Sequence, residues 1–251
     1  MSCERDDVAA VIFAAGLGTR MGSDQPKALL PLGGRPIVKH VLDSVVSAGI
    51  RKIVVVVGHQ RAQVQRCIGN GVAYAEQECQ KGTAHALMCA REALRDFRGR
   101  LITLYCDVPF VPPDLLGRLA AECAGPGVAA SMVTVELEDP GAYGRIVRDR
   151  QGKVTAIREA AGAAAEQLAI KEINAGIYCF RAPLIFEVAA EIAPDPVKGE
   201  LYLTDAIAIL AGRGHEIAVI RARDPSVVMG VNTRAELEAA ELVVQGMRRG
   251  E

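Results

Sequence analysis

The strongest constraint on the fold of this chain is a series of short apolar runs that stop abruptly at glycine or at a polar residue. Residues 8–15 are continuously apolar and stop at Gly16, and residues 53–57 and 101–106 form two further runs. Apolar runs of this length are typical of strands buried on both faces of a parallel sheet. The sequence therefore predicts a parallel sheet enclosed by helices.

Helical patterns separate these runs. Behind Pro36, apolar residues recur at helical spacing, and Gly49 is placed to end that helix. A helix from about residue 60, a short strand at residues 72–75 and a helix over 83–94 continue the alternation. This order predicts an α/β fold with a doubly wound, mostly parallel sheet, whose ligands bind beyond the carboxyl ends of the strands. We expect the site just after Ala15, Val57, Ala75 and Cys106.

The second half of the chain does not continue the alternation of strands and helices; its patterns predict short strands joined by turns. We expect a single domain made of a first half, a smaller β-rich second half that faces it, and a C-terminal helix. The first half covers about residues 8–125, the second about 126–232, and the helix 233–251; the strands of the second half are expected at 128–136, 143–148, 153–159 and 174–180.

Composition excludes several classes of protein. With 29 Lys+Arg against 30 Asp+Glu the net charge is −1, which disfavours a nucleic-acid partner. The apolar runs are far shorter than the ~20 residues of a membrane span, and the acidic start differs from the basic start of a signal peptide. The seven cysteines form no C-x-x-C pair, so neither a disulfide framework nor a zinc cluster is indicated. We expect a cytoplasmic protein without membrane contact.

A glycine-rich loop, Gly16-Leu-Gly-Thr-Arg-Met-Gly22, follows the first strand. Backbone N–H groups freed by glycine can approach a phosphate closely. The loop matches neither the dinucleotide fingerprint, which needs glycine where Met21 stands, nor the P-loop pattern. Arg20 and Lys27 place two cations beside it, which suits a triphosphate. A flexible turn without a ligand is the alternative for the loop taken alone.

Seven motifs in order resemble a known family. Phe13-Ala-Ala-Gly-Leu-Gly-Thr-Arg-Met21, with Pro26-Lys27 and Leu32-Gly-Gly-Arg-Pro36, resembles the signature of the sugar-phosphate nucleotidyltransferases. The chain is most similar, from about residue 8 to 246, to the uridyltransferase domain of the bacterial N-acetylglucosamine-1-phosphate uridyltransferases. The further motifs are Gln77-x-x-Gln80-x-Gly82-Thr83-Ala-His-Ala86, Tyr105-Cys-Asp-Val-Pro109, Asp139-Pro-x-x-Tyr-Gly-Arg-Ile146, Ile173-Asn-Ala-Gly176, Gly199-Glu-x-Tyr-Leu-Thr-Asp205 and Gly230-Val-Asn-x-Arg234.

The resemblance implies a Rossmann-like nucleotidyltransferase sheet with a sugar-binding second half. It also implies Mg²⁺-dependent transfer of a nucleotidyl group, UMP from UTP, to a sugar 1-phosphate, N-acetylglucosamine 1-phosphate, with release of pyrophosphate. The chain contains no hexapeptide repeats of a left-handed β-helix, so we expect no acetyltransferase domain. The sequence gives no indication of the oligomeric state.

The same resemblance assigns roles to individual residues. It implies nucleotide binding by Phe13, Ala14, Ala15, Gly16, Gly18, Gln77, Gln80, Gly82 and Thr83, sugar binding by Tyr105, Gly144, Glu159 and Asn174, catalysis by Arg20, Lys27 and Asp107, and Mg²⁺ binding by Asp107 and Asn232. A glutamine amide offers both a donor and an acceptor to the imide edge of uracil, and Mg²⁺ prefers oxygen ligands.

Structural roles are the alternatives for several of these residues. The two glutamines could be solvated surface amides, and Asp107 and Asn232 could cap helices. However, Thr233-x-x-Glu236 already supplies a capping box, which leaves the Asn232 amide oxygen available for a cation. Glu159 and Asn174, each taken alone, could equally be surface residues.

Three positions depart from the uridyltransferase pattern. Cys106 stands where the family has glycine, Ala160-Ala161 stand where it has a lysine within two residues of Glu159, and Ala142 replaces a glycine. The alternatives are therefore a transferase for another phosphate, such as glucose 1-phosphate, cytidylyl or guanylyl transfer, or a nucleotide-sugar-binding module with little turnover.

Overall fold

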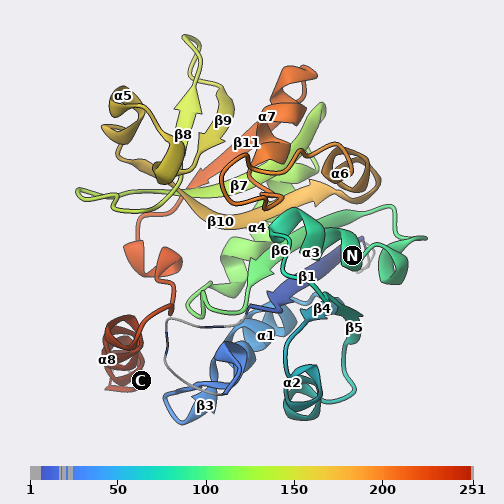
Figure 1. The fold of residues 1–251 in the computed structure, drawn as a ribbon, viewed down its shortest axis with the longest axis vertical. Helices are drawn as coiled ribbons and strands as arrows, with labels where there is room; N and C mark the ends of the chain where they lie inside the picture. The colour runs from blue at the N-terminus through green and yellow to red at the C-terminus, as the bar shows by residue number, and fades with distance from the viewer. Residues whose placement is uncertain (1–6, 17, 19–20, 22–24, 250–251) are drawn as a thin grey trace.

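The computed structural model describes residues 7–16, 18, 21 and 25–249. Its centre is a sheet of nine strands with the main order β11-β7-β10-β6-β1-β4-β5 (Figure 1). The strands are β1 (Val8–Ala14), β4 (Lys52–Val57), β5 (Ala73–Glu76), β6 (Arg100–Tyr105), β7 (Val128–Glu136), β8 (Arg145–Arg148), β9 (Val154–Arg158), β10 (Glu172–Arg181) and β11 (Glu216–Arg221). A small separate pair is formed by β2 (Pro31–Leu32) and β3 (Arg35–Pro36).

The direction of the strands decides which edge of the sheet can carry a site. Strands β6, β1, β4 and β5 are parallel neighbours, so their carboxyl ends lie along one edge. Strand β10 runs antiparallel between β6 and β7, and its beginning therefore lies at that same edge. The β8–β9 hairpin joins the sheet through β10.

Helices cover both faces of the sheet. Helices α1 (Ile37–Ser47), α2 (Arg61–Ile68) and α4 (Pro113–Cys123) contribute apolar side chains to one core, and α3 (Thr83–Cys89), α6 (Ala182–Ala189) and α7 (Asp205–Gly212) to the core on the other face. Helix α8 (Arg234–Arg249) packs through Ala240 and Val244 onto the region of β2. A short helix α5 (Ala165–Leu168) precedes β10. No helix in the described part of the chain has the length and apolarity needed to cross a lipid bilayer.

The predicted α/β fold is confirmed, and the sheet extends further than the sequence indicates. Strands β7, β10 and β11 of the second half continue the sheet of the first half, while β8 and β9 extend from its main path. The helix behind Pro36 begins at Ile37, as the sequence predicts. Helices α6 and α7 and strand β11 are not among the elements expected from the sequence.

Candidate active site

The predicted nucleotide-binding residues gather at the carboxyl edge of the parallel strands. Ala15 follows β1, Gln77 follows β5, and Asp107 comes two residues after the end of β6. Asn174 lies near the beginning of the antiparallel strand β10 and is therefore at the same edge. The topology of the sheet thus collects residues from both halves of the chain.

The Lys27 side chain is the centre of this site. It extends from a 3-10 turn (Lys27–Leu29), and only 11% of the side chain is exposed. Its ammonium group donates hydrogen bonds to the Asp107 carboxylate and, over 2.7 Å, to Oδ1 of Asn232. The two proposed metal ligands, although far apart in the sequence, therefore converge on one cationic group.

Backbone contacts hold Asp107 and Asn232 in this arrangement. The N–H of Val231 donates to the carbonyl oxygen of Asp107 over 2.8 Å, which joins the end of β6 to the segment before α8. The predicted capping box is present: the Glu236 carboxylate accepts from the N–H groups of Asn232 and Thr233, and the Thr233 hydroxyl accepts from that of Glu236. Because Glu236 and Thr233 supply these contacts, the Asn232 side-chain oxygen is directed to Lys27.

The two predicted glutamines hold neighbouring loops at the carboxyl edge of the parallel strands. Gln77 is buried, and its Nε2 donates to the carbonyl oxygen of Gly82 over 3.0 Å and lies 3.0 Å from Nδ1 of His85. Gln80 is exposed, but its Nε2 donates to the carbonyl oxygen of Ala15 over 3.0 Å. A solvated amide without structural contacts, the alternative for these residues, is therefore not what the structure shows.

The glycine-rich loop is described only in part. Phe13, Ala14 and Ala15 are buried, and Gly16 is exposed with no neighbouring atom within 4 Å of an added Cβ. Gly18 adopts φ +64°, and a Cβ there would lie 2.9 Å from Cβ of Lys27. A side chain at this position would therefore disturb the lysine. Arg20, predicted to be catalytic, lies outside the described residues.

Gly82 and Thr83 connect this edge of the sheet to the segment before α7. Gly82 adopts φ +97°, and a Cβ there would lie 2.5 Å from the carbonyl oxygen of Leu201. The N–H of Leu203 donates to the Thr83 hydroxyl over 2.8 Å. The Gly199–Asp205 motif, to which the sequence assigns no individual role, thus closes one side of the site.

Glu159 lines a cavity of about 730 Å³, whose wall also includes Tyr202, Asp205 and Lys198. Burial raises the pKa of the Glu159 carboxyl, while the Thr204 hydroxyl, which donates to Oε1 over 3.1 Å, opposes that rise. A carboxylate in such a cavity can accept hydrogen bonds from sugar hydroxyls. Thr204 and Lys198 are not predicted from the sequence, although both belong to or adjoin its Gly199–Asp205 motif.

Gly144 and Asn174 border the same region. A Cβ on Gly144 would lie 2.9 Å from Cγ2 of Ile157 and 3.5 Å from Oε2 of Glu159, so glycine leaves room beside the carboxylate. The N–H of Asn174 donates to the Gly144 carbonyl oxygen over 2.9 Å. These contacts bring three of the four predicted sugar-binding residues together.

Tyr105, the fourth, packs against a bulge in β10. The pairing of β10 with β7 shifts between Asn174 and Tyr178, and Gly176 adopts φ +73° with the N–H donating to Oδ1 of Asn174 over 3.0 Å. A Cβ on Gly176 would lie 3.0 Å from the Tyr105 ring, so glycine admits the ring. Burial raises the pKa of Tyr105, and the hydroxyl therefore stays protonated. Bulges often re-aim side chains next to active sites.

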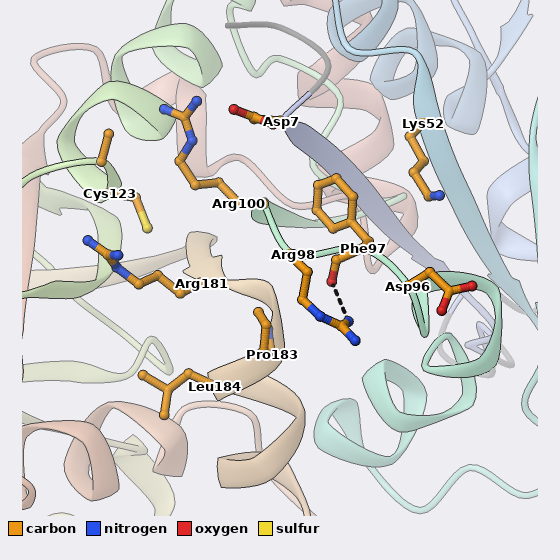
Figure 2. A pocket seen from close by; sticks show the side chains of 12 residues that line it. Asp7, Lys52, Asp96, Phe97, Arg98, Arg100, Cys123, Arg181, Pro183 and Leu184 are labelled. Carbon is orange, nitrogen blue, oxygen red and sulfur yellow. Dashed lines mark hydrogen bonds between the residues drawn. The ribbon is translucent and has the colours of Figure 1, made fainter.

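A second cavity, of about 750 Å³, lies at the opposite edge of the sheet (Figure 2). It is lined by residues near the beginnings of β1 and β6 and the end of β10. Arg181 donates to the carbonyl oxygens of Val128 and Gly125, and Arg98 to that of Phe97. These arginines therefore bond to backbone carbonyl oxygens of neighbouring segments. None of the predicted site residues that the structure describes lines this cavity.

The donor set fits a hard divalent cation only in combination with substrate. Across residues 7–16, 18, 21 and 25–249, no three His, Cys, Asp or Glu side chains are grouped to hold a metal ion. Asp107 and Asn232 offer one carboxylate and one amide oxygen that already converge on a cation. Mg²⁺ is commonly bound by one or two carboxylates together with substrate phosphates and water, so these two residues suit it.

Comparison with known proteins agrees with this geometry. Residues 10–176 match the family described as MobA-like NTP transferase domain, and the chain belongs to this family of nucleotidyltransferases. The protein named Bifunctional protein GlmU of Solibacter usitatus is 42% identical over 241 residues, which cover 95% of this chain and 52% of that protein. The proteins of the same name from Syntrophotalea carbinolica and Corynebacterium glutamicum are each 40% identical to this chain. The first alignment covers 96% of this chain and 52% of the relative, and the second covers 100% of this chain and 54% of the relative. The chain thus spans about half the length of the curated relatives it matches, and the family predicted from the motifs is confirmed.

Proposed function

We propose that the protein transfers UMP from UTP to N-acetylglucosamine 1-phosphate, forming a nucleotide sugar and releasing pyrophosphate, with Mg²⁺ as the cofactor. The observation that carries this proposal is the convergence of Lys27, Asp107 and Asn232 at the carboxyl edge of the sheet. The relatives named GlmU, which denotes an N-acetylglucosamine-1-phosphate uridyltransferase, support the choice of nucleotide and sugar.

The reaction needs alignment and charge neutralisation more than it needs a base. A sugar 1-phosphate carries about −1.5 to −2 charges near neutral pH, so its oxygen is a competent nucleophile. This oxygen attacks the α-phosphorus of UTP in line with the bond to the leaving group, and pyrophosphate leaves. Asp107 and Asn232 would hold Mg²⁺, which neutralises charge on the reacting phosphates when it is bound.

The side chains of the protein divide the remaining work. Lys27 screens the triphosphate and stabilises negative charge on the leaving pyrophosphate. Gln77 and Gln80 fix the loops against which the base binds, and Gly82 and Thr83 close over it. Glu159 and Asn174 bind the hydroxyls and the acetamido group of the sugar.

The test is an assay of pyrophosphate release from UTP and N-acetylglucosamine 1-phosphate, with Mg²⁺ and with the metal removed by EDTA. We expect release only with Mg²⁺. A panel of ATP, CTP and GTP, each with N-acetylglucosamine 1-phosphate or glucose 1-phosphate, tests the specificity. Faster release with another pair would reassign the substrates, and ligand binding without release from any pair would indicate a binding module.

The first prediction concerns Lys27 itself. Lys27→Met keeps a side chain of similar length but removes the cation, so we expect kcat/KM to fall by about 10²–10³, the usual cost of losing an electrostatic stabiliser. Lys153→Met, on the exposed turn between β8 and β9, is the matched control and should retain the activity of the unsubstituted protein. A Lys27→Met enzyme that folds and retains more than a tenth of the activity would contradict the assignment.

A further inference from the structure

The side-chain amide of Gln77 is held in one orientation by the turn that follows it. Its Nε2 lies 3.0 Å from the carbonyl oxygen of Gly82, and a carbonyl oxygen only accepts hydrogen bonds, so the NH₂ end of the amide faces Gly82. The same carbonyl oxygen accepts from the N–H of Ala86 over 3.1 Å, which fixes it in the first turn of α3. The other end of the amide, Oε1, is thereby turned away from Gly82.

His85 of α3 engages the same NH₂ group. Its Nδ1 lies 3.0 Å from Nε2 of Gln77. Because that nitrogen of Gln77 only donates, Nδ1 is the acceptor, which leaves the histidine ring neutral with its proton on Nε2. The sulfur of Cys89, one turn further along α3, lies 4.0 Å from Nε2 and is a weak acceptor that fits this tautomer. Both amide hydrogens of Gln77 are thus committed to the protein.

Oε1 of Gln77 is the part of the amide that is left for a ligand. Within the part of the chain that the structure describes it accepts no hydrogen bond. It is nevertheless not one of the polar atoms sealed from solvent without a partner, although the Gln77 side chain as a whole is buried. An open acceptor of this kind favours ligand groups that carry a hydrogen and disfavours those that present a lone pair.

This arrangement distinguishes the two common pyrimidine bases. N3 of uracil carries a hydrogen that an amide oxygen accepts, whereas N3 of cytosine is itself an acceptor and would oppose Oε1 with a lone pair. A glutamine free to turn its amide over could present the NH₂ group to cytosine instead. Gly82 and His85 oppose that turn, because it would bring Oε1 of Gln77 against the Gly82 carbonyl oxygen and the lone pair on Nδ1 of His85.

We propose that His85 is a positioning residue for base recognition: together with the Gly82 carbonyl it locks the Gln77 amide so that only Oε1 meets the nucleobase, which selects UTP over CTP. This inference rests on the proposed function, because it names the groups by which that site distinguishes its nucleotide. It requires no contact between His85 and the substrate.

The test compares His85→Leu with His85→Asn. Leucine places a methyl group where Nδ1 stands, whereas asparagine can place an acceptor oxygen there. Binding of UTP and of CTP is measured by calorimetry with Mg²⁺ and without sugar phosphate. For His85→Leu we expect the preference for UTP over CTP to fall by about three- to tenfold, the range that the loss of one hydrogen bond produces. For His85→Asn the preference should stay within twofold of that of the unsubstituted protein.

Steady-state kinetics and a control variant separate positioning from a general loss of structure. In pyrophosphate release the effect of His85→Leu should appear in KM for UTP, while kcat and KM for the sugar phosphate stay within twofold. His215→Leu is the control, because His215 precedes β11, whose beginning lies at the opposite edge of the sheet. It should leave the preference for UTP within twofold.

A double-mutant cycle tests whether His85 acts through Gln77. In a Gln77→Ala background, His85→Leu should have no further effect on the preference for UTP. A fall of less than threefold for His85→Leu, an equal fall for His85→Asn or His215→Leu, or full additivity with Gln77→Ala would overturn the inference.

The binding measurement also distinguishes this inference from the proposed function. If the unsubstituted protein prefers UTP but releases no pyrophosphate, the proposed transfer fails, and the binding ratios of the variants still decide the role of His85. If the unsubstituted protein binds CTP as tightly as UTP, the role of His85 is refuted even when pyrophosphate release is observed.

Discussion

A single ammonium group joins the two halves of the chain at the site. Lys27, Asp107 and Asn232 are each assigned a role by their own sequence motif, but no motif indicates that one side chain bonds to the other two. The energetic contribution of this ion pair depends on its burial as well as on the distance between the charges, because an exposed ion pair contributes little to stability. The same burial makes the site sensitive to the loss of any one of the three residues.

Lys198 places a positive charge near Glu159, where the sequence lacks the lysine of the family pattern. The family lysine expected after Glu159 is replaced by Ala160-Ala161, but Lys198 lines the same cavity and its charge lowers the pKa of Glu159 against the larger effect of burial. The residue is exposed, so solvent screens its charge.

For Lys198→Ala we predict a rise of about two- to fivefold in KM for the sugar phosphate, the size expected for an exposed ionic contact. KM for UTP should not change. Lys153→Ala, which also removes an exposed lysine but lies outside the cavity, is the control. Equal KM values for the two variants would show that Lys198 does not contribute to binding of the sugar phosphate.

At the scale of elements, the loop between β5 and α3 depends on one glycine. Gly82 combines a positive φ with close approach to the backbone of Leu201, and the N–H of Leu201 in turn donates to the carbonyl oxygen of Lys81 over 2.8 Å. Backbone atoms cannot move aside as a flexible side chain can. A side chain at residue 82 would therefore push apart the two segments that we propose close over the nucleotide.

We predict that Gly82→Ala lowers the free energy of unfolding by more than about 1 kcal/mol, because it adds backbone strain to a steric clash. It should also raise KM for UTP. Gly117→Ala in α4 is the opposite case: a Cβ there meets no atom within 4 Å, and alanine should stabilise the helix by about 0.5–1 kcal/mol. Urea denaturation of the two variants measures both effects, and a stabilised Gly82→Ala protein would refute the argument.

At the scale of the whole molecule, Glu172 links four strands of the second half. It begins β10 and is mostly buried. Its carboxylate accepts from Thr134 of β7 over 2.8 Å and from Arg148 of β8 over 2.7 and 2.9 Å, and Arg221 of β11 lies 3.6 Å away. Burial alone would raise the pKa of Glu172, but the hydrogen bonds from Arg148 and Thr134 and the nearby guanidinium charges outweigh it and lower the pKa.

This arrangement predicts a loss of stability in acid. Because the pKa of Glu172 is lower in the folded protein than the usual 4.5, its stabilisation is complete above about pH 4.5 and disappears as the pH falls through the folded value. Glu172→Gln should reduce stability at neutral pH and should flatten the dependence of unfolding free energy on pH below 4.5. The experiment is urea denaturation between pH 3 and 7, and an unchanged slope in the variant would show that other carboxylates dominate.

Local sequence patterns were sufficient to predict many of the strands and helices. The buried runs identify β1, β4, β6 and β7 because continuous apolar stretches need no tertiary information, and Pro36 and the Thr233–Glu236 capping box mark where α1 and α8 begin. Helices α6 and α7 were not predicted because both are rich in apolar residues, which leaves few polar positions to mark the 3.6-residue period of an amphipathic helix.

The sequence by itself determined the α/β class, the family and the residue types at the carboxyl edge of the parallel strands, since these follow from local periodicity and from motifs of adjacent residues. Only the tertiary structure decided that Lys27 bonds to both Asp107 and Asn232, and that β10 inserts antiparallel between β6 and β7. Each of these features joins segments distant in the chain, and such contacts form only when the whole sheet is assembled.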